Sequence, residues 1–285
     1  MTVMTFAVDD RHFTDYHQLG FCVFRGLLPT ALLRDLRREA DKGRAIARRL
    51  AGDQAQRLQP IQAYPELDMR PFDDLYDLPA LRTALNRVLG PGFRAPVDPR
   101  ASRDLMGVLY EPAAMPWATC WHRDWRDNVP GLQLAEWDKL QLDTRYFNQV
   151  NCALYDDDCT WVVPGSHLRR DTAGEMHRFP TRPIAGPALE GLDVDDAERA
   201  CMAYCESMPG AHQVHLHAGD YLLYRNSLWH LGNYAPYKRR ATIHDGVMSP
   251  EFSAFWKAPP LHPVREDGSR PHENPNEAAL AALAG

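Results

Sequence analysis

Short β-rich runs follow one another from about residue 104, and most of them have no long helix between them. The runs read LMGVLY, TRYFNQVNCALY, TWVVPG, HQVHLHAGDYLLY and RRATIHDGVM, with turn-rich or acidic stretches between them. Parallel strands need crossover connections of about a dozen residues or more, so this spacing favours antiparallel pairing. We therefore expect a mainly β fold with flanking helices, in which the strands form a sandwich or a barrel.

Helical patterns lie mainly before these strands. Leucines and alanines recur every three or four residues in ALLRDLRREADKGRAIARRL (31–50), a helix that Pro29 and Thr30 open. A second helix is expected in DLPALRTALNRVLG (77–90), with Gly90 at its end. We expect one domain over 1–285. Its parts are an N-terminal, partly helical region (1–100), the β core (101–250, with an insertion at 168–212) and an irregular C-terminal extension (251–285).

The insertion 168–212 contains DVDDAERACMAYCESM, a predicted helix that Asp193 can cap. Loops around a binding site usually carry recognition, so we expect substrate specificity in this insertion and in 126–145. The arginines at 123, 126 and 145 are candidates for contacts with an anionic substrate group, and equally for ordinary surface positions.

Charge and composition exclude two classes of partner. The net charge of −6 gives no broad positive field for nucleic acid, and no apolar run approaches the roughly 20 residues of a membrane span. The first residues, MTVMTFAVDDRHF, are acidic where a secretory signal needs an apolar stretch, which predicts a cytoplasmic protein. The six cysteines form no CxxC pair and are expected to be buried thiols.

A zinc cluster is one alternative use of these thiols. Cys201 and Cys205 precede His212, His215 and His217, but the spacing matches no tetrahedral zinc pattern, so we disfavour it. His215 and His217 share a strand face and remain alternative metal ligands.

A stronger metal-binding pattern begins in CWHRDWRDN (120–128). Residues i and i+2 of a strand project to the same side, so His122 and Asp124 can bind one ion. A mononuclear iron(II) site uses two histidines and one carboxylate and leaves the other coordination positions open. His230, between a β-rich run and a strand that starts with two arginines, is the candidate third ligand.

These elements resemble the phytanoyl-CoA dioxygenase-like branch of the iron(II)/2-oxoglutarate-dependent oxygenases. LGFCVFRGLLP resembles the family's opening, HRD its proximal His-x-Asp and CTWVVPGSH its strand and Pro-Gly-Ser-His turn. HLHAGDYLLY is similar to the Gly-Asp strand, and WHLGNYAPYKRRATIH to the segment with the distal His, Asn and Arg. The five elements follow the family's order and cover most of the chain.

The resemblance implies a double-stranded β-helix, a jelly-roll or cupin-like barrel. It also implies Fe(II) held by His122, Asp124 and His230, which would be the catalytic centre. 2-Oxoglutarate would be the co-substrate, and its oxidative decarboxylation with O2 would be coupled to hydroxylation or a related C–H oxidation of a small molecule. Halogenating relatives have Gly or Ala in place of the carboxylate, so Asp124 predicts oxidation rather than chlorination.

The chain departs from the family at two places. Asp157-Asp158 stands where relatives usually have Asn-Gly, and the interval from the distal histidine to the arginine is shorter by two residues. Arg239 and Arg240 are therefore both candidates for binding the distal carboxylate of 2-oxoglutarate. We favour Arg239 because it shares a strand face with the apolar Ala241 and Ile243, which we assign to the barrel interior.

Further polar and aromatic residues are candidates for roles around the site. Gln149 and Asn151 share one face of an apolar strand and need buried partners, so we expect them to contact the co-substrate. We expect His167 to be structural, and His244 to serve either packing or substrate contact. The tryptophans are expected to pack rather than to form a cage; they are Trp117, Trp121, Trp125 and Trp161.

Two other functions compete with the oxygenase. One is a non-catalytic barrel that binds a metabolite, and the other is a cupin-like metalloenzyme that does not use 2-oxoglutarate. The intact set of two histidines and a carboxylate disfavours the first, and the two arginines disfavour the second.

Overall fold

The structure is a computed structural model that describes residues 6–91, 106–124, 141, 143, 148–178, 186–225 and 227–247. The expected extension 251–285, the residues Trp125, Arg126 and Arg145, and most of 126–145 lie outside the described residues.

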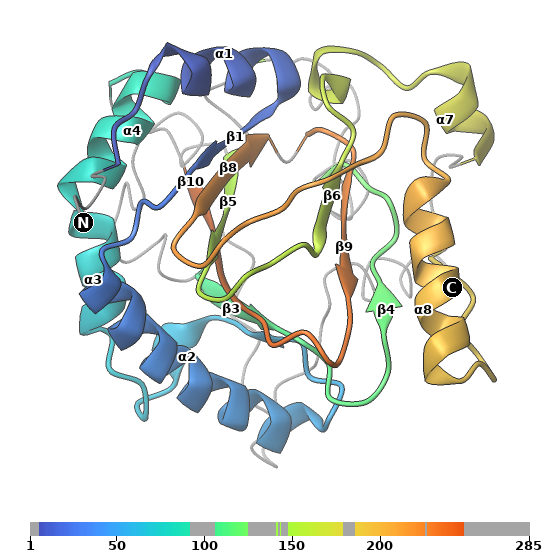
Figure 1. The fold of residues 1–285 in the computed structure, drawn as a ribbon, viewed down its shortest axis with the longest axis horizontal. Coiled ribbons are helices and arrows are strands. Elements are labelled where there is room, and N and C mark those ends of the chain that lie inside the picture. The colour runs from blue at the N-terminus through green and yellow to red at the C-terminus, as the bar shows by residue number, and fades with distance from the viewer. Residues whose placement is uncertain are drawn as a thin grey trace, which may run out of the picture.

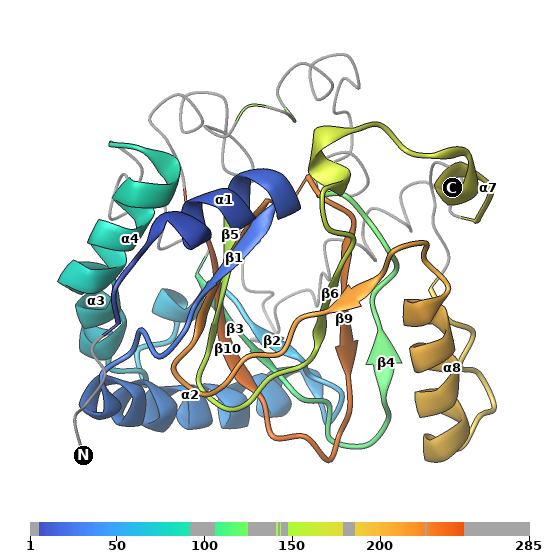
Figure 2. The same cartoon turned by 45° about the horizontal axis from the view of Figure 1, so that its top comes forward.

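Two open antiparallel sheets face each other (Figure 2). The six-stranded sheet has the order β1 (Phe21–Phe24), β8 (Tyr221–Arg225), β5 (Asn148–Ala153), β10 (Ala241–Val247), β3 (Gly107–Tyr110) and β2 (Arg57–Leu58). The four-stranded sheet has the order β4 (Trp117–Ala118), β9 (His230–Tyr234), β6 (Thr160–Val162) and β7 (His212–Gln213). The described strand pairs are all antiparallel, which confirms the expectation from the spacing of the runs.

Helices cover the outer sides of both sheets (Figure 1). Those on the side of the six-stranded sheet are α1 (Asp10–Leu19), α2 (Thr30–Ala51), α3 (Arg70–Asp77) and α4 (Pro79–Leu89). Beside the four-stranded sheet lies α8 (Val194–Glu206); the short elements are η1 (Ile61–Ala63), η2 (Ser166–Leu168) and α7 (Ala173–Arg178). The helices expected at 31–50 and 77–90 are thus confirmed as α2 and α4.

The main apolar core lies between the six-stranded sheet and its helices. Leu36 and Ile46 of α2 and Phe72 of α3 pack there against Leu223 and Ile243 of the sheet. These positions recur with the periods of a helix and of a strand. The apolar face of α2 that the sequence predicts is therefore the face that packs on the sheet.

Helix α8 lies in the insertion and is well packed. The side chain of Asp193 accepts a hydrogen bond from the backbone N–H of Asp196, as expected for its cap. Cys201 and Cys205 are buried in a second cluster with Trp121. The described part of the insertion therefore belongs to the body of the molecule. In the ranges described, no helix has both the length and the apolar character that crossing a membrane requires.

Candidate metal centre

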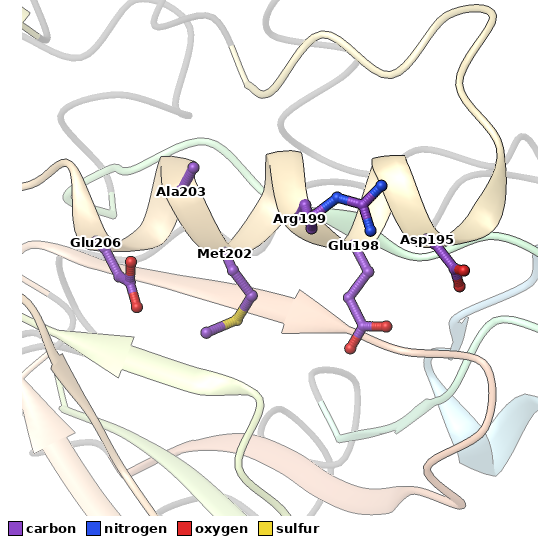
Figure 3. A pocket seen from close by; sticks show the side chains of 6 residues that line it. All are labelled: Asp195, Glu198, Arg199, Met202, Ala203 and Glu206. Atoms are coloured by element: carbon purple, nitrogen blue, oxygen red, sulfur yellow. The ribbon is translucent and has the colours of Figure 1, made fainter.

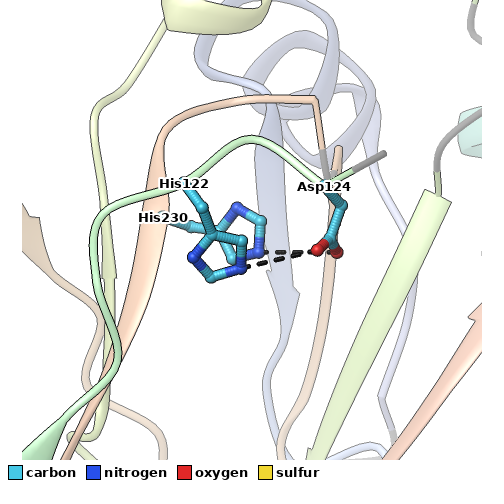
Figure 4. A group of neighbouring side chains, drawn as sticks. All are labelled: His122, Asp124 and His230. Carbon is cyan, nitrogen blue, oxygen red and sulfur yellow. Dashed lines mark ion pairs between the residues drawn. The ribbon is translucent and has the colours of Figure 1, made fainter. Parts of the chain in front are cut away.

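His122, Asp124 and His230 meet between the two sheets (Figure 4). His230 begins β9, and His122 lies opposite it in an isolated antiparallel bridge, with backbone N···O distances of 3.0 and 3.1 Å. The Asp124 carboxylate lies 3.4 Å from Nε2 of His122 and 3.6 Å from Nε2 of His230. The expected triad therefore comes together from two segments more than 100 residues apart in sequence.

Backbone carbonyls fix the orientation of both imidazole rings. Nδ1 of His122 lies 2.8 Å from the carbonyl oxygen of Cys120, and Nδ1 of His230 lies 2.9 Å from that of Leu228. A carbonyl only accepts hydrogen bonds, so each Nδ1 donates to its carbonyl oxygen and each Nε2 faces Asp124. Metal-binding histidines are commonly oriented in this way.

The charge of Asp124 also fits a cation site. Burial opposes its ionisation, but the contacts with His122 and His230 outweigh the burial and hold the pKa of Asp124 well below its usual range. Two histidine Nε2 atoms and a carboxylate converge here, and a metal cation between them can bind to all three. Two imidazoles and one carboxylate on one side of a site are the donor set of a mononuclear iron(II) centre.

Arg123 lies between His122 and Asp124 in the sequence, but its side chain points to the opposite side of the backbone. It is fully buried and donates from Nη1 to the carbonyl oxygens of Ser166 and Ser227 at 2.8 and 2.7 Å. Its Nε donates to Asp171 at 3.1 Å, and its guanidinium lies over the ring of Trp229. Arg123 thus fixes the backbone that carries His122 and Asp124, and its complete burial among protein partners fits neither the substrate contact nor the surface position expected for it.

A polar network lines the inner face of the six-stranded sheet. Nδ1 of His244 donates to Oδ1 of Asn151 at 2.8 Å, so its Nε2 accepts from the amide of Gln149 at 2.6 Å. Asn151 in turn donates to Oγ1 of Thr160 at 3.1 Å. Gln149 and Asn151 share a face, as expected. Burial first, then the nearby Arg57, lowers the pKa of His244 to about 3, so its ring is neutral.

The two arginines before β10 point in opposite directions, and our assignment of their faces is wrong. The side chain of Arg239 is 58% exposed and pairs with Asp41 at 2.7 Å. The side chain of Arg240 is 3% exposed and lies between the sheets, where its Nε donates to Asp157 at 2.8 Å. The reason is that the apolar face of this strand, with Ala241 and Ile243, packs in the helix-covered core. The polar face therefore points inward.

Arg57 is a site residue that the sequence analysis missed. In β2 it pairs with Leu109 of β3, so its side chain lies on the inner face, opposite to that of the core residue Leu58. Burial lowers the pKa of Arg57, while Tyr234 and Asp124 partly offset that effect. Its guanidinium makes no hydrogen bond or ion pair with the described residues. A two-residue strand has no periodicity that would have indicated this position.

Two tyrosines complete the inner surface near the triad. The ring of Tyr224 lies edge-on to His230, with centroids 5.5 Å apart. Tyr234 stacks on Trp117 at 4.6 Å, and the guanidinium of Arg240 lies 4.9 Å from the centre of its ring. Burial raises the pKa of both tyrosines, so both offer neutral hydroxyl groups.

The alternative metal ligands His215, His217, Cys201 and Cys205 lie apart from the triad. His215 and His217 are exposed, while Cys201 and Cys205 are buried in the α8 cluster, so the described residues form no zinc site from this group. His167 is structural, as expected: its Nε2 lies 3.3 Å from the His17 carbonyl oxygen, and burial lowers its pKa to about 4.

The tryptophans that the structure describes pack, as expected. Trp121 and Trp161 lie in the cluster under α8, and Trp117 stacks on Tyr234.

A hollow of about 420 Å³ lies along α8 (Figure 3). Its lining consists of Asp195, Glu198, Arg199, Met202, Ala203 and Glu206. Arg199 pairs with Asp196, and Glu198 accepts a hydrogen bond from Tyr237, so these side chains are paired at the surface. The hollow includes none of the triad.

Comparisons with known proteins place the fold. No family model and no curated protein matches the sequence. Among solved structures, the epimerase SnoN in complex with Fe3+, alpha ketoglutarate and nogalamycin RO matches with a TM-score of 0.53 and 17% identity, over 93% of this chain and 96% of its own.

Two further structures match over most of their length. The non-heme alpha ketoglutarate dependent carbocyclase SnoK from nogalamycin biosynthesis has a TM-score of 0.54 and 17% identity, over 90% of this chain and 94% of its own. HygX from Streptomyces hygroscopicus, with nickel and 2-oxoglutarate bound, has a TM-score of 0.54 and 15% identity, over 86% of this chain and 88% of its own. At these identities the chain shares the fold of these enzymes.

Proposed function

We propose that the protein is an iron(II)- and 2-oxoglutarate-dependent dioxygenase that oxidises a C–H bond of a small molecule. The observation that carries this proposal is the triad of His122, Asp124 and His230, with both Nε2 atoms directed at one carboxylate. The similarity to SnoN, SnoK and HygX supports it, because structures of that fold bind iron or nickel together with 2-oxoglutarate.

The proposal includes the finer assignments of the sequence analysis. We assign the chain to the phytanoyl-CoA dioxygenase-like family as one oxygenase domain over 1–285, and the two sheets to the halves of a double-stranded β-helix. We also propose a cytoplasmic location, because all six cysteines are free and five of them are buried.

His122, Asp124 and His230 would hold Fe(II) on one side and leave its remaining positions for 2-oxoglutarate and O2. Bound iron would couple the oxidative decarboxylation of 2-oxoglutarate to oxidation of the substrate. The residues of the inner face then bind and orient the co-substrate. Gln149 and Asn151, already ordered by His244, present amide groups to this space.

A guanidinium is suited to the distal carboxylate, because charge-assisted hydrogen bonds are about twice as strong as neutral ones. The exposed pair of Arg239 with Asp41 disfavours Arg239 for this role. Among the described residues, Arg57 and Arg240 are the arginines on the inner face, and we propose that the distal carboxylate binds on this face.

Hydroxylation is the outcome that we propose. Asp124 occupies the ligand position that chlorinating relatives leave open. SnoN is an epimerase and SnoK a carbocyclase, so the fold also supports other oxidative outcomes.

Succinate formation tests the proposal directly. The purified protein should release succinate only when both Fe(II) and 2-oxoglutarate are added, and Asp124→Ala should abolish the release. Asp156→Ala, which changes an exposed carboxylate, is the matched control and should behave as the wild type. Turnover with iron but without 2-oxoglutarate would support the cupin-like metalloenzyme. Metabolite binding without any turnover would support the non-catalytic barrel.

A further inference from the structure

Arg240 already has a carboxylate partner inside the molecule. Its Nε donates to Oδ2 of Asp157 at 2.8 Å, and both side chains are buried. The ion pair outweighs burial and raises the pKa of Arg240, so the guanidinium is charged and its charge is balanced. One buried nitrogen, Nη1, has no hydrogen-bond partner among the described residues, so Arg240 retains the capacity for a further hydrogen bond.

Asp157 is held where it is by the fold. Its backbone exchanges two hydrogen bonds with Leu216, at 2.9 and 2.8 Å. Its Oδ1 accepts from the backbone N–H of Cys159 at 2.8 Å, and its Oδ2 also accepts from Thr242 at 2.5 Å. A carboxylate with this many partners does not swing away when another anion enters, because all of these bonds would be lost together.

Arg57 presents the opposite situation. Its side chain lies on the same inner face, with Asp124, Tyr224 and Tyr234 among its electrostatic neighbours. Asp124 belongs to the metal centre, and no described carboxylate forms an ion pair with Arg57. A guanidinium that is partly removed from water and has no hydrogen-bond or ion-pair partner among the described residues is costly, and an anionic ligand would satisfy it.

We propose, on the basis of the proposed function, that Arg57 binds the distal carboxylate of 2-oxoglutarate, and that Asp157 is an internal counter-ion that withholds Arg240 from it. The pair of Asp157 and Arg240 then serves as a neutral wall of the co-substrate pocket. Arg57 supplies the charge, from a strand that precedes the whole metal-binding region in sequence.

Calorimetric titration of 2-oxoglutarate into the nickel(II)-loaded full-length protein tests this assignment without turnover. Arg57→Gln should weaken binding by about 10- to 100-fold, the loss of a charged hydrogen bond. The double variant Asp157→Asn with Arg240→Gln removes the pair without changing the net charge, and binding should stay within about fivefold of the wild type. Asp157→Asn alone releases Arg240 and should tighten binding.

Melting temperatures separate a binding role from a structural one. Without 2-oxoglutarate, Arg57→Gln should melt no lower than the wild type, because it removes a partly buried charge that has no ion-pair partner among the described residues. With saturating 2-oxoglutarate, it should lose most of the increase that the wild type shows. Arg57→Lys keeps the charge and should bind with intermediate affinity.

Two results would overturn the inference while leaving the proposed function intact. One is a double variant that loses as much affinity as Arg57→Gln, which would make Arg240 the anchor. The other is unchanged affinity of Arg57→Gln. A nickel-loaded wild type that does not bind 2-oxoglutarate at all would instead contradict the proposed function itself.

Discussion

The two faces of the six-stranded sheet are both covered, but they are built from different residues. On the helix side, Leu223 and Ile243 belong to a continuous apolar core. On the inner side, the same strands carry Gln149, Asn151 and His244, joined by hydrogen bonds. A polar face of a strand usually indicates solvent, whereas here it indicates the site. The hydrogen-bond partners of the polar side chains, rather than their polarity alone, therefore show which face of the sheet is functional.

The largest effect is expected on the apolar face. Leu223→Ala removes a fully buried side chain from β8 and should lower the free energy of unfolding by about 2–5 kcal/mol. Denaturant unfolding of the metal-free protein measures this loss. The metal affinity of the folded molecules should not change, and a parallel loss of metal affinity would break the distinction between the faces.

Asp245 is a buried carboxyl group on the helix-covered, largely apolar face, and it should make the stability of the protein depend on pH. Burial raises the pKa of Asp245 to about 7, although hydrogen bonds from Tyr76 and the Gly246 N–H oppose the shift. The folded protein therefore retains a proton that the unfolded chain, with an ordinary carboxyl, releases above about pH 4. Stability should fall between about pH 4 and pH 7, by an amount on the order of 4 kcal/mol.

Unfolding curves of the wild type and Asp245→Asn at several pH values measure this contribution. The variant cannot ionise at this position, so its stability should lack that part of the fall. Identical pH profiles for the two proteins would show that Asp245 does not titrate in this window.

The inner face should respond in function rather than in stability. Asp124→Asn removes the anionic donor of the triad and should weaken Fe(II) binding by at least about 100-fold, since even residues that only orient ligands contribute about 10- to 100-fold. Competition with a chromophoric chelator gives the affinity, and unchanged binding would contradict the metal centre.

The smallest effect is expected at the surface. Arg239→Ala breaks an exposed pair with Asp41 and should change stability by about 0–1 kcal/mol. Affinity for 2-oxoglutarate should stay the same. A large loss of that affinity would restore Arg239 as the anchor and would contradict the observed directions of the two arginines.

Much of the fold follows from periodicity in the sequence. Helix α2, helix α4 and the cap of α8 at Asp193 are each indicated by local patterns, and antiparallel pairing follows from the spacing of the runs. The His-x-Asp pair could also be found, because alternation along a strand places both side chains on one side.

The directions of side chains could not be predicted from the sequence where they depend on tertiary packing. Arg239 and Arg240 are adjacent and chemically identical, and the choice between them depends on which face of β10 the helices cover. Arg57 lies in a strand of two residues, which shows no alternation at all. In both cases the deciding contact comes from a distant part of the chain.

The two metal-directed histidines owe their orientation to the main chain of their own segments. The acceptors are the carbonyl oxygens of Cys120 and Leu228, each two residues before its histidine, and the backbone bridge joins the two segments. Side-chain changes elsewhere leave such acceptors in place. The surrounding loops can therefore diversify over evolution while the metal centre is inherited as a unit, so a new substrate can be acquired without rebuilding the reactive centre.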